Sequence, residues 1–192
     1  MRILMLGNSF TFVNQLPEKL AHLTGTEVIH HTRGGARLAE QLNPNTKMGK
    51  RTQEALQNQK WDYVVLQEMS NGPITARKSF LTNVERLCVQ IRENGAVPVL
   101  YATWAYQRGG KQLEEFGMEY GEMYCQMYEA YHEAADQNHA LIADVGKCFY
   151  ELADTKELYA EDGCHPSEEG SRIAAEIIAD VILKDQRNSH SS

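Results

Sequence analysis

Residues 2–9 read Arg-Ile-Leu-Met-Leu-Gly-Asn-Ser, an apolar run that stops at three small or polar residues. A short and unbroken apolar run is typical of a strand that is buried on both faces of a parallel sheet. The glycine and asparagine that follow it favour a turn. This segment therefore predicts a first strand over Ile3–Leu6, with Ser9 just beyond its carboxyl end.

Four more short runs resemble the first, and longer segments with helical periodicity separate them. The expected strands are Ile3–Leu6, Glu27–His31, Tyr63–Gln67, Val97–Thr103 and Ala140–Asp144. The expected helices are Gln15–Thr24, Gly49–Gln59, Ala76–Asn94, Gln112–Asn138 and Ser167–Asp185. This alternation predicts an α/β sandwich built on a five-stranded parallel sheet. We expect one domain over residues 1–186 and a polar, disordered tail over 187–192.

Charge and composition exclude several classes of function. The net charge of −7, with no cluster of lysine and arginine, argues against nucleic acid as a partner. No apolar stretch approaches the ~20 residues of a membrane helix, and the N-terminus does not resemble a secretory signal. We therefore expect a cytoplasmic protein without a membrane partner. No metal or cofactor is expected, because the chain lacks a Cys/His zinc cluster and a glycine-rich phosphate loop.

Polar loops follow the first four expected strands, where α/β proteins bind their ligands. Ser9 follows the first strand, Gly34 and Gly35 the second, Gln67–Asn71 the third and Trp104 the fourth. The carboxyl ends of parallel strands meet at one edge of the sheet, so these loops should lie together. The segment Asp162-Gly-Cys-His165 precedes the last helix and is placed to fold over the same edge.

Ser9, His165 and Asp162 have the side chains that nucleophilic catalysis requires. A histidine can take the proton of a serine hydroxyl at neutral pH, and a carboxylate can orient the imidazole ring. Each residue also has a structural interpretation. Ser9 could leave a strand through a turn, Asp162 could form a turn with its glycine neighbour, and His165 could make a structural hydrogen bond at a helix entry.

Acyl transfer also needs hydrogen-bond donors for the developing oxyanion. The backbone N–H of Ser9, the Gly34-Gly35 pair and a side-chain amide from Gln67 or Asn71 are the candidates. Glu68 is expected to be structural and to bond loop amides. Trp104 could line a substrate pocket, although an aromatic residue of the core or its rim is the favoured interpretation.

These residues resemble the blocks of the SGNH (GDSL-like) hydrolase family. Gly7-Asn8-Ser9-Phe10 is similar to the first block, Gly34-Gly35 to the glycine block and Asp162-x-x-His165 to the last block. The resemblance implies a flavodoxin-like three-layer α/β/α domain that hydrolyses esters, often acetyl or short acyl groups on sugars or other small molecules. It implies Ser9 as nucleophile, His165 as base and Asp162 as the orienting carboxylate.

Two blocks depart from the family pattern. Gly-Asn-Ser replaces the usual Gly-Asp-Ser, so an amide at Asn8 stands where the family has a carboxylate. The usual Gly-x-Asn-Asp of the third block is replaced by Leu-Gln-Glu-Met-Ser-Asn over 66–71. By analogy with Gln-containing branches of the family, Gln67 would donate to the oxyanion, with Asn71 as the alternative. We assign Asn8, Gly34 and Trp104 to the substrate-binding surface.

The sequence thus predicts a serine esterase that acts on a small-molecule ester, with acetylated sugars among the implied substrates. Ser9, Gly35 and Gln67 or Asn71 would hold the oxyanion, and an acyl-Ser9 intermediate would form. Two alternatives stay open. The chain could be a flavodoxin-like binding module without catalysis, or an acyltransferase that uses the same three residues.

Overall fold

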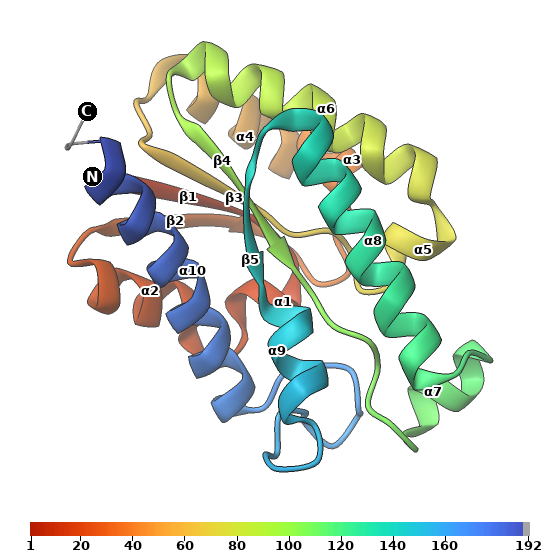
Figure 1. Cartoon of the computed structure of the whole chain (residues 1–192). Coiled ribbons are helices and arrows are strands. Elements are labelled where there is room, and N and C mark those ends of the chain that lie inside the picture. Colours follow the sequence, from red (N-terminus) through yellow and green to blue (C-terminus); the bar gives the residue numbers. More distant parts are fainter. Residues whose placement is uncertain (190–192) are drawn as a thin grey trace.

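A parallel sheet of five strands crosses the protein in the order β2-β1-β3-β4-β5 (Figure 1). The computed structural model describes residues 1–189. The strands are β1 (Arg2–Gly7), β2 (Glu27–Thr32), β3 (Tyr63–Leu66), β4 (Val97–Ala102) and β5 (Leu141–Asp144). Each of the four strand pairs is parallel. The predicted α/β fold with a flavodoxin-like strand order is therefore confirmed, and the predicted strand ends are within one residue of those observed.

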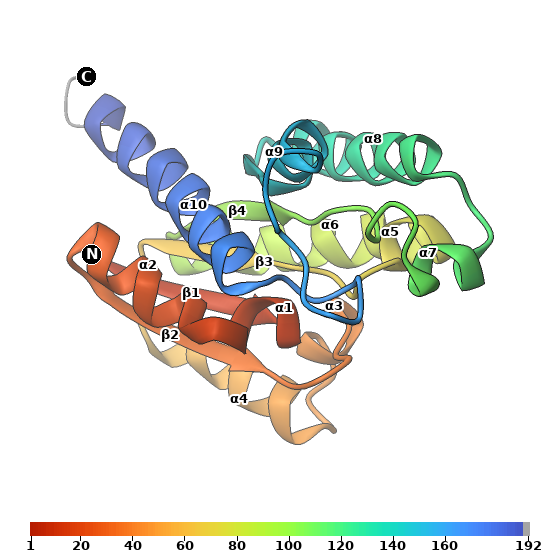
Figure 2. The ribbon, with the colours of Figure 1, turned by 90° about the horizontal axis from the view of Figure 1, so that it is seen from below.

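Helices cover both faces of the sheet, which gives three layers (Figure 2). One layer contains α2 (Leu16–Thr24) and α10 (Glu168–Ser189), which pack against each other. The other layer contains α4 (Lys47–Asn58), α6 (Arg77–Asn94) and α8 (Tyr120–Asn138). Shorter helices lie in the connections: α1 (Ser9–Phe12), η1 (Val13–Gln15), α3 (Leu38–Gln41), α5 (Gly72–Thr75), α7 (Lys111–Phe116) and α9 (Val145–Leu152).

The central strands owe their apolar sequence to this double cover. Every residue of β3, and Ile3 to Gly7 of β1, is buried, because helices pack on both sides. The edge strand β2 is more polar and more exposed than either. Since β1 and β3 are neighbours in register, the loops that follow them leave the sheet side by side.

The long helix predicted over Gln112–Asn138 is wrong in one respect, because the chain breaks into α7 and α8. Gly117 ends α7 with a φ of +73°, a left-handed conformation that favours glycine. Its N–H donates to the carbonyl groups of Leu113 and Glu114, both at 3.1 Å. The periodic apolar residues on either side of Gly117 concealed this helix end.

The last helix is longer than the sequence indicated. α10 continues to Ser189, so the first part of the predicted tail, 187–189, is helical rather than disordered. The rest of that tail, 190–192, lies outside the described residues. Within residues 1–189, no helix is long and apolar enough to cross a bilayer.

Candidate active site

Ser9 lies where β1 passes into the short helix α1. Asn8 is the N-cap of this helix, and its side-chain Oδ1 accepts the N–H of Phe10 at 3.0 Å. Asparagine suits this position because its short side chain can reach the free amides of the first turn. The turn presents the half-buried Ser9 at the carboxyl edge of the sheet.

Ser9, His165 and Asp162 form a continuous chain of hydrogen bonds. Ser9 Oγ lies 2.8 Å from His165 Nε2, and His165 Nδ1 lies 2.5 Å from Asp162 Oδ2. The structure thus brings together one residue from the start of the chain and two from the loop before α10, as the sequence predicts. The arrangement has the geometry of a nucleophile, a base and an orienting carboxylate.

The other oxygen of Asp162 holds its own loop. Oδ1 accepts the backbone N–H groups of Cys164 at 3.0 Å and His165 at 2.9 Å. Burial by itself would raise the pKa of Asp162, but the hydrogen bonds from the His165 ring and these two amides outweigh it and hold the pKa below its usual value. An ionised Asp162 places the ring proton of His165 on Nδ1 and leaves Nε2 to accept from Ser9.

Trp104 supports the His165 loop from the interior. Its indole stacks between Phe10 and Phe149, with ring centroids 4.8 Å and 4.1 Å away, and is 1% exposed. Its Nε1–H donates to the carbonyl oxygen of Cys164 at 2.9 Å. These contacts favour the interpretation of Trp104 as a core aromatic, and they leave little of the ring for a substrate to touch.

Gln67 lies beneath the nucleophile turn and is 1% exposed. Its Oε1 accepts the N–H of Asn8 and the hydroxyl of Thr11, both at 3.0 Å, while Nε2 donates to the Glu68 carbonyl at 2.5 Å. A Cβ on Gly7 would come within 2.6 Å of Oε1, so the close packing here requires glycine. Both ends of the Gln67 amide are therefore already engaged.

Asn71 is the alternative side-chain donor. It precedes α5, is half-buried, and accepts the Thr75 hydroxyl at 3.4 Å through Oδ1. The hydroxyl of Tyr106 lies 2.9 Å from Ser70 Oγ and also interacts with the Asn71 side chain. These contacts fix Asn71 beyond the carboxyl end of β3, next to the strand that leads to Ser9.

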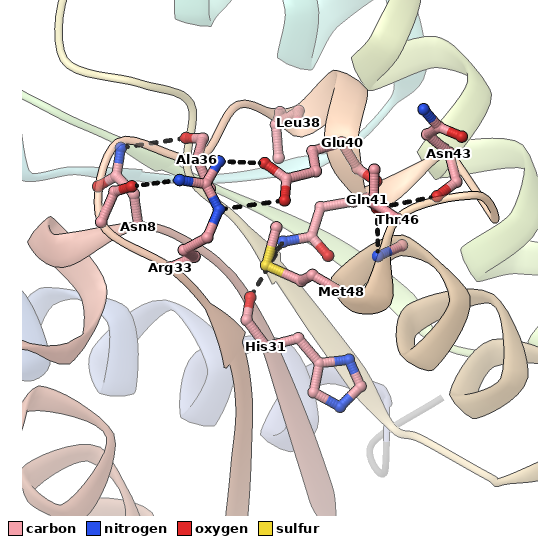
Figure 3. A network of polar contacts seen from close by, with 12 residues as sticks. Asn8, His31, Arg33, Ala36, Leu38, Glu40, Gln41, Asn43, Thr46 and Met48 are labelled. Carbon is pink, nitrogen blue, oxygen red and sulfur yellow. Dashed lines mark hydrogen bonds and ion pairs between the residues drawn. The ribbon is translucent and has the colours of Figure 1, made fainter.

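Gly34 and Gly35 lie in a tight turn between Arg33 and Ala36, and this turn lies next to Asn8 (Figure 3). The N–H of Ala36 donates to the Arg33 carbonyl at 3.1 Å, and Gly35 has a φ of +67°. Asn8 Nδ2 donates to the carbonyl of Ala36 at 3.3 Å. The loop is thus tied to the Ser9 turn, and Gly34 and Gly35 remain exposed.

An ion pair holds the same loop from its outer side. Arg33 Nη2 lies 2.5 Å from Glu40 Oε2, and Arg33 Nη1 donates to the Gly34 carbonyl at 2.8 Å (Figure 3). Sequence reasoning missed this pair, since seven residues separate its members and no local pattern links them. It also missed the link that Asn8 makes between the two loops. The sequence places Asn8 on the substrate-binding surface, whereas the residue is 3% exposed and its side chain points inward.

Comparison with solved structures identifies the family. A protein from Slackia heliotrinireducens described as an SGNH hydrolase is 49% identical, with a TM-score of 0.92, over 95% of this chain and 98% of that chain. The chain belongs to the SGNH hydrolase family. No family model matches it, and neither does any curated protein.

More distant structures share the SGNH hydrolase fold. A DUF4886 family protein from Bacteroides uniformis is 21% identical with a TM-score of 0.72, over 94% of this chain and 82% of that chain. An acetylxylan esterase from Geobacillus stearothermophilus is 14% identical with a TM-score of 0.69, over 94% and 93% of the two chains. At this level of identity the likeness concerns the fold alone.

Asn8 and Gln67 are the residues of the SGNH-like blocks whose side chains point differently from the prediction. Both were predicted to face the ligand, and both use their amide groups inside the protein. Glu68, by contrast, bonds loop amides as the sequence led us to expect.

Proposed function

We propose that this SGNH hydrolase is a serine esterase that cleaves small acyl esters, of which acetyl is the simplest. The observation that carries the proposal is the chain of hydrogen bonds from Ser9 through His165 to Asp162, with distances of 2.8 Å and 2.5 Å. A serine within hydrogen-bond reach of a neutral imidazole, itself oriented by a carboxylate, is equipped for attack on a carbonyl carbon.

In the proposed reaction, Ser9 Oγ attacks the ester carbonyl while its proton passes to His165 Nε2. The carbonyl electron pair moves onto oxygen and returns when the alcohol leaves with the proton from His165. A water molecule then gives a proton to the same nitrogen and attacks the acyl-Ser9 carbonyl. Release of the carboxylic acid returns the proton to Ser9.

The oxyanion needs donors that converge beside Ser9. We assign the backbone N–H groups of Ser9 and Gly35 to the oxyanion site. Among residues 1–189, these two groups take part in none of the hydrogen bonds found. For the third donor we favour Asn71 over Gln67, because Asn71 is half-buried beyond the carboxyl end of β3, whereas Gln67 is 1% exposed beneath the nucleophile turn.

Acetylated sugars are the substrates we would test first. One solved structure with the same fold is an acetylxylan esterase. The Gly34-Gly35 loop is exposed, and a Cβ at either glycine would meet no atom within 4 Å, so this loop leaves room for a bulky alcohol portion. A series of chromogenic esters with increasing acyl length, followed by acetylated xylose oligomers, would define the acyl and alcohol preferences.

The test compares the wild-type protein with Ser9→Ala and with a matched control, Ser79→Ala, which removes an exposed hydroxyl on α6. We expect Ser9→Ala to lower kcat on p-nitrophenyl acetate by at least about 10³-fold and to abolish labelling by a fluorophosphonate, since the nucleophile is gone. The control should match the wild type. Equal turnover and labelling in Ser9→Ala would refute the proposal.

Product analysis separates hydrolysis from transfer. If glycerol or a sugar acceptor diverts most of the acyl group from water, the enzyme is an acyltransferase. If folded wild-type protein is not labelled but binds a sugar or acyl ligand saturably, it is a binding module.

A further inference from the structure

Glu68 is a buried carboxyl group that the proposed reaction does not use. It follows β3, and its residue is 3% exposed. Its Oε1 accepts two backbone N–H groups, from Met69 at 2.7 Å and from Leu38 at 3.3 Å. A single oxygen atom therefore connects two segments that are about thirty residues apart in the chain.

The two segments lead directly to the proposed oxyanion donors. Leu38 begins α3, immediately after the turn that contains Gly35. Met69 lies in the same loop as Asn71, between β3 and α5. The Glu68 carboxyl group therefore links these two loops.

The surroundings of Glu68 restrict its movement. Its own N–H donates to the Tyr131 hydroxyl at 3.3 Å, and Tyr131 is a buried residue of α8. A Cβ on Gly72 would lie 3.0 Å from Glu68 Cγ, so the helix α5 packs closely against the side chain. Glu68 is thus held through its backbone by α8 and through its side chain by α5, in addition to the two amide partners of its carboxyl group.

A carboxyl group is an unfavourable choice if its only task is to fill this space. Burial raises the pKa of Glu68, while the amides of Met69 and Leu38 and the charge of Arg37 act in the opposite direction. Removing a carboxyl group from water costs free energy that an apolar side chain would not incur. The feature that an apolar side chain could not supply is the oxygen acceptor shared by the two loops.

We propose that Glu68 is a positioning residue for the oxyanion site, which holds the Gly35 loop and the Asn71 loop at the separation that catalysis requires. This inference rests on the proposed esterase function. Donors stabilise an oxyanion only when they are fixed in advance at its position, so a small shift of either loop lowers kcat more than it weakens substrate binding.

The test uses two substitutions at the same position. Glu68→Met keeps the approximate volume and removes the acceptor, whereas Glu68→Gln keeps an oxygen acceptor without the charge. We expect Glu68→Met to lower kcat on p-nitrophenyl acetate by about 10- to 100-fold with little change in KM, and Glu68→Gln to restore most of the rate. Glu85→Gln on the exposed face of α6 is the control.

A second measurement distinguishes positioning from a merely structural role. Sulfur is a poorer hydrogen-bond acceptor than oxygen, so a thionoester gains less than an ester from an intact oxyanion site. The ratio of ester to thionoester turnover should therefore fall about tenfold in Glu68→Met. Gly72→Ala would place a Cβ 3.0 Å from Glu68 Cγ and press that side chain aside by a few tenths of an ångström without removing its acceptor. It should lower the same ratio even if Glu68→Met does not fold.

The outcomes separate this inference from the proposed function. An active wild type whose ester to thionoester ratio is unchanged in Glu68→Met and in Gly72→Ala overturns the role of Glu68 alone. So does a variant whose loss lies entirely in KM. A wild type without turnover that depends on Ser9 overturns both proposals.

Discussion

Replacing Asn8 by aspartate, the residue usual in this family, is expected to destabilise this particular protein. In the wild type, Asn8 uses both ends of its amide, accepting from Phe10 N–H at 3.0 Å and donating to the Ala36 carbonyl at 3.3 Å. A carboxylate would keep the first bond. It would lose the second and turn an oxygen toward the carbonyl oxygen of Ala36.

The size of the expected stability loss follows from the burial of Asn8, which is 3% exposed. Loss of one hydrogen bond costs about 1 kcal/mol, and leaving a buried carbonyl opposite a second acceptor adds about 1–3 kcal/mol. The free energy of unfolding at pH 7 should therefore fall by about 2–4 kcal/mol. Because Asn8 also links the Ser9 turn to the Gly35 loop, kcat should fall about tenfold or more.

The stability loss of Asn8→Asp should increase with pH. Burial beside a carbonyl raises the pKa of the introduced carboxyl group above its unfolded value of about 3.9, since the protonated form can donate to Ala36. A raised pKa in the folded state gives stability that is present below the unfolded pKa and disappears as pH rises through the folded pKa. The difference between Asn8→Asp and wild type should thus be small near pH 4 and large at pH 7.

Urea denaturation at several pH values measures this difference. Asn8→Ala is the control, because it loses both hydrogen bonds but introduces no titrating group, so its deficit should not vary with pH. The reasoning is refuted if Asn8→Asp unfolds at the wild-type urea concentration at pH 7, or if its deficit is the same at pH 4 and pH 7.

Three further substitutions test other parts of the site. Gly7→Ala places a methyl group within 2.6 Å of two side-chain oxygens and should lower the free energy of unfolding by about 2–4 kcal/mol in urea denaturation; a loss below ~0.5 kcal/mol would contradict the packing argument. Trp104→Phe keeps the ring stack but loses the bond to the Cys164 carbonyl, so kcat should fall about tenfold with a stability loss of only ~1 kcal/mol; an unchanged kcat would show that this bond does not position His165. Asp162→Asn should lower kcat by on the order of 10³-fold or more, because the amide no longer selects the Nδ1–H tautomer; a wild-type rate would remove Asp162 from the mechanism. Since the pKa of Asp162 is lowered in the fold, its stabilising contribution exists above the unfolded pKa of about 3.9 and disappears on acidification, and Asp162→Asn should lose this pH dependence in denaturation experiments.

The sheet could be predicted well because its signal is local. Buried parallel strands require continuous apolar runs, and glycine, asparagine or proline near the strand ends marks the turns. The same local information placed Ser9 after the first strand and His165 before the last helix. The helix end at Gly117 is also marked by a glycine, but the apolar stripe resumes beyond it, so periodicity alone predicts one continuous helix.

The orientation of individual amide side chains could not be predicted. Gln67 was expected to face the ligand, yet its oxygen is drawn inward by the N–H of Asn8 and the hydroxyl of Thr11. These partners come from the turn after β1 and from α1, 59 and 56 residues away in the chain. Only the packing of β3 beside β1 determines that they meet.

The sequence alone thus determined the fold class, the edge of the sheet where we place the active site and the three residues that we propose for acyl transfer. These depend on residue type and on the alternation of short and long apolar periods, both of which can be read along the chain. Only the tertiary structure decided which polar side chains face the open site and which hold its loops together. That division depends on hydrogen-bond partners from distant segments, and in a buried region nearly every polar group must find one.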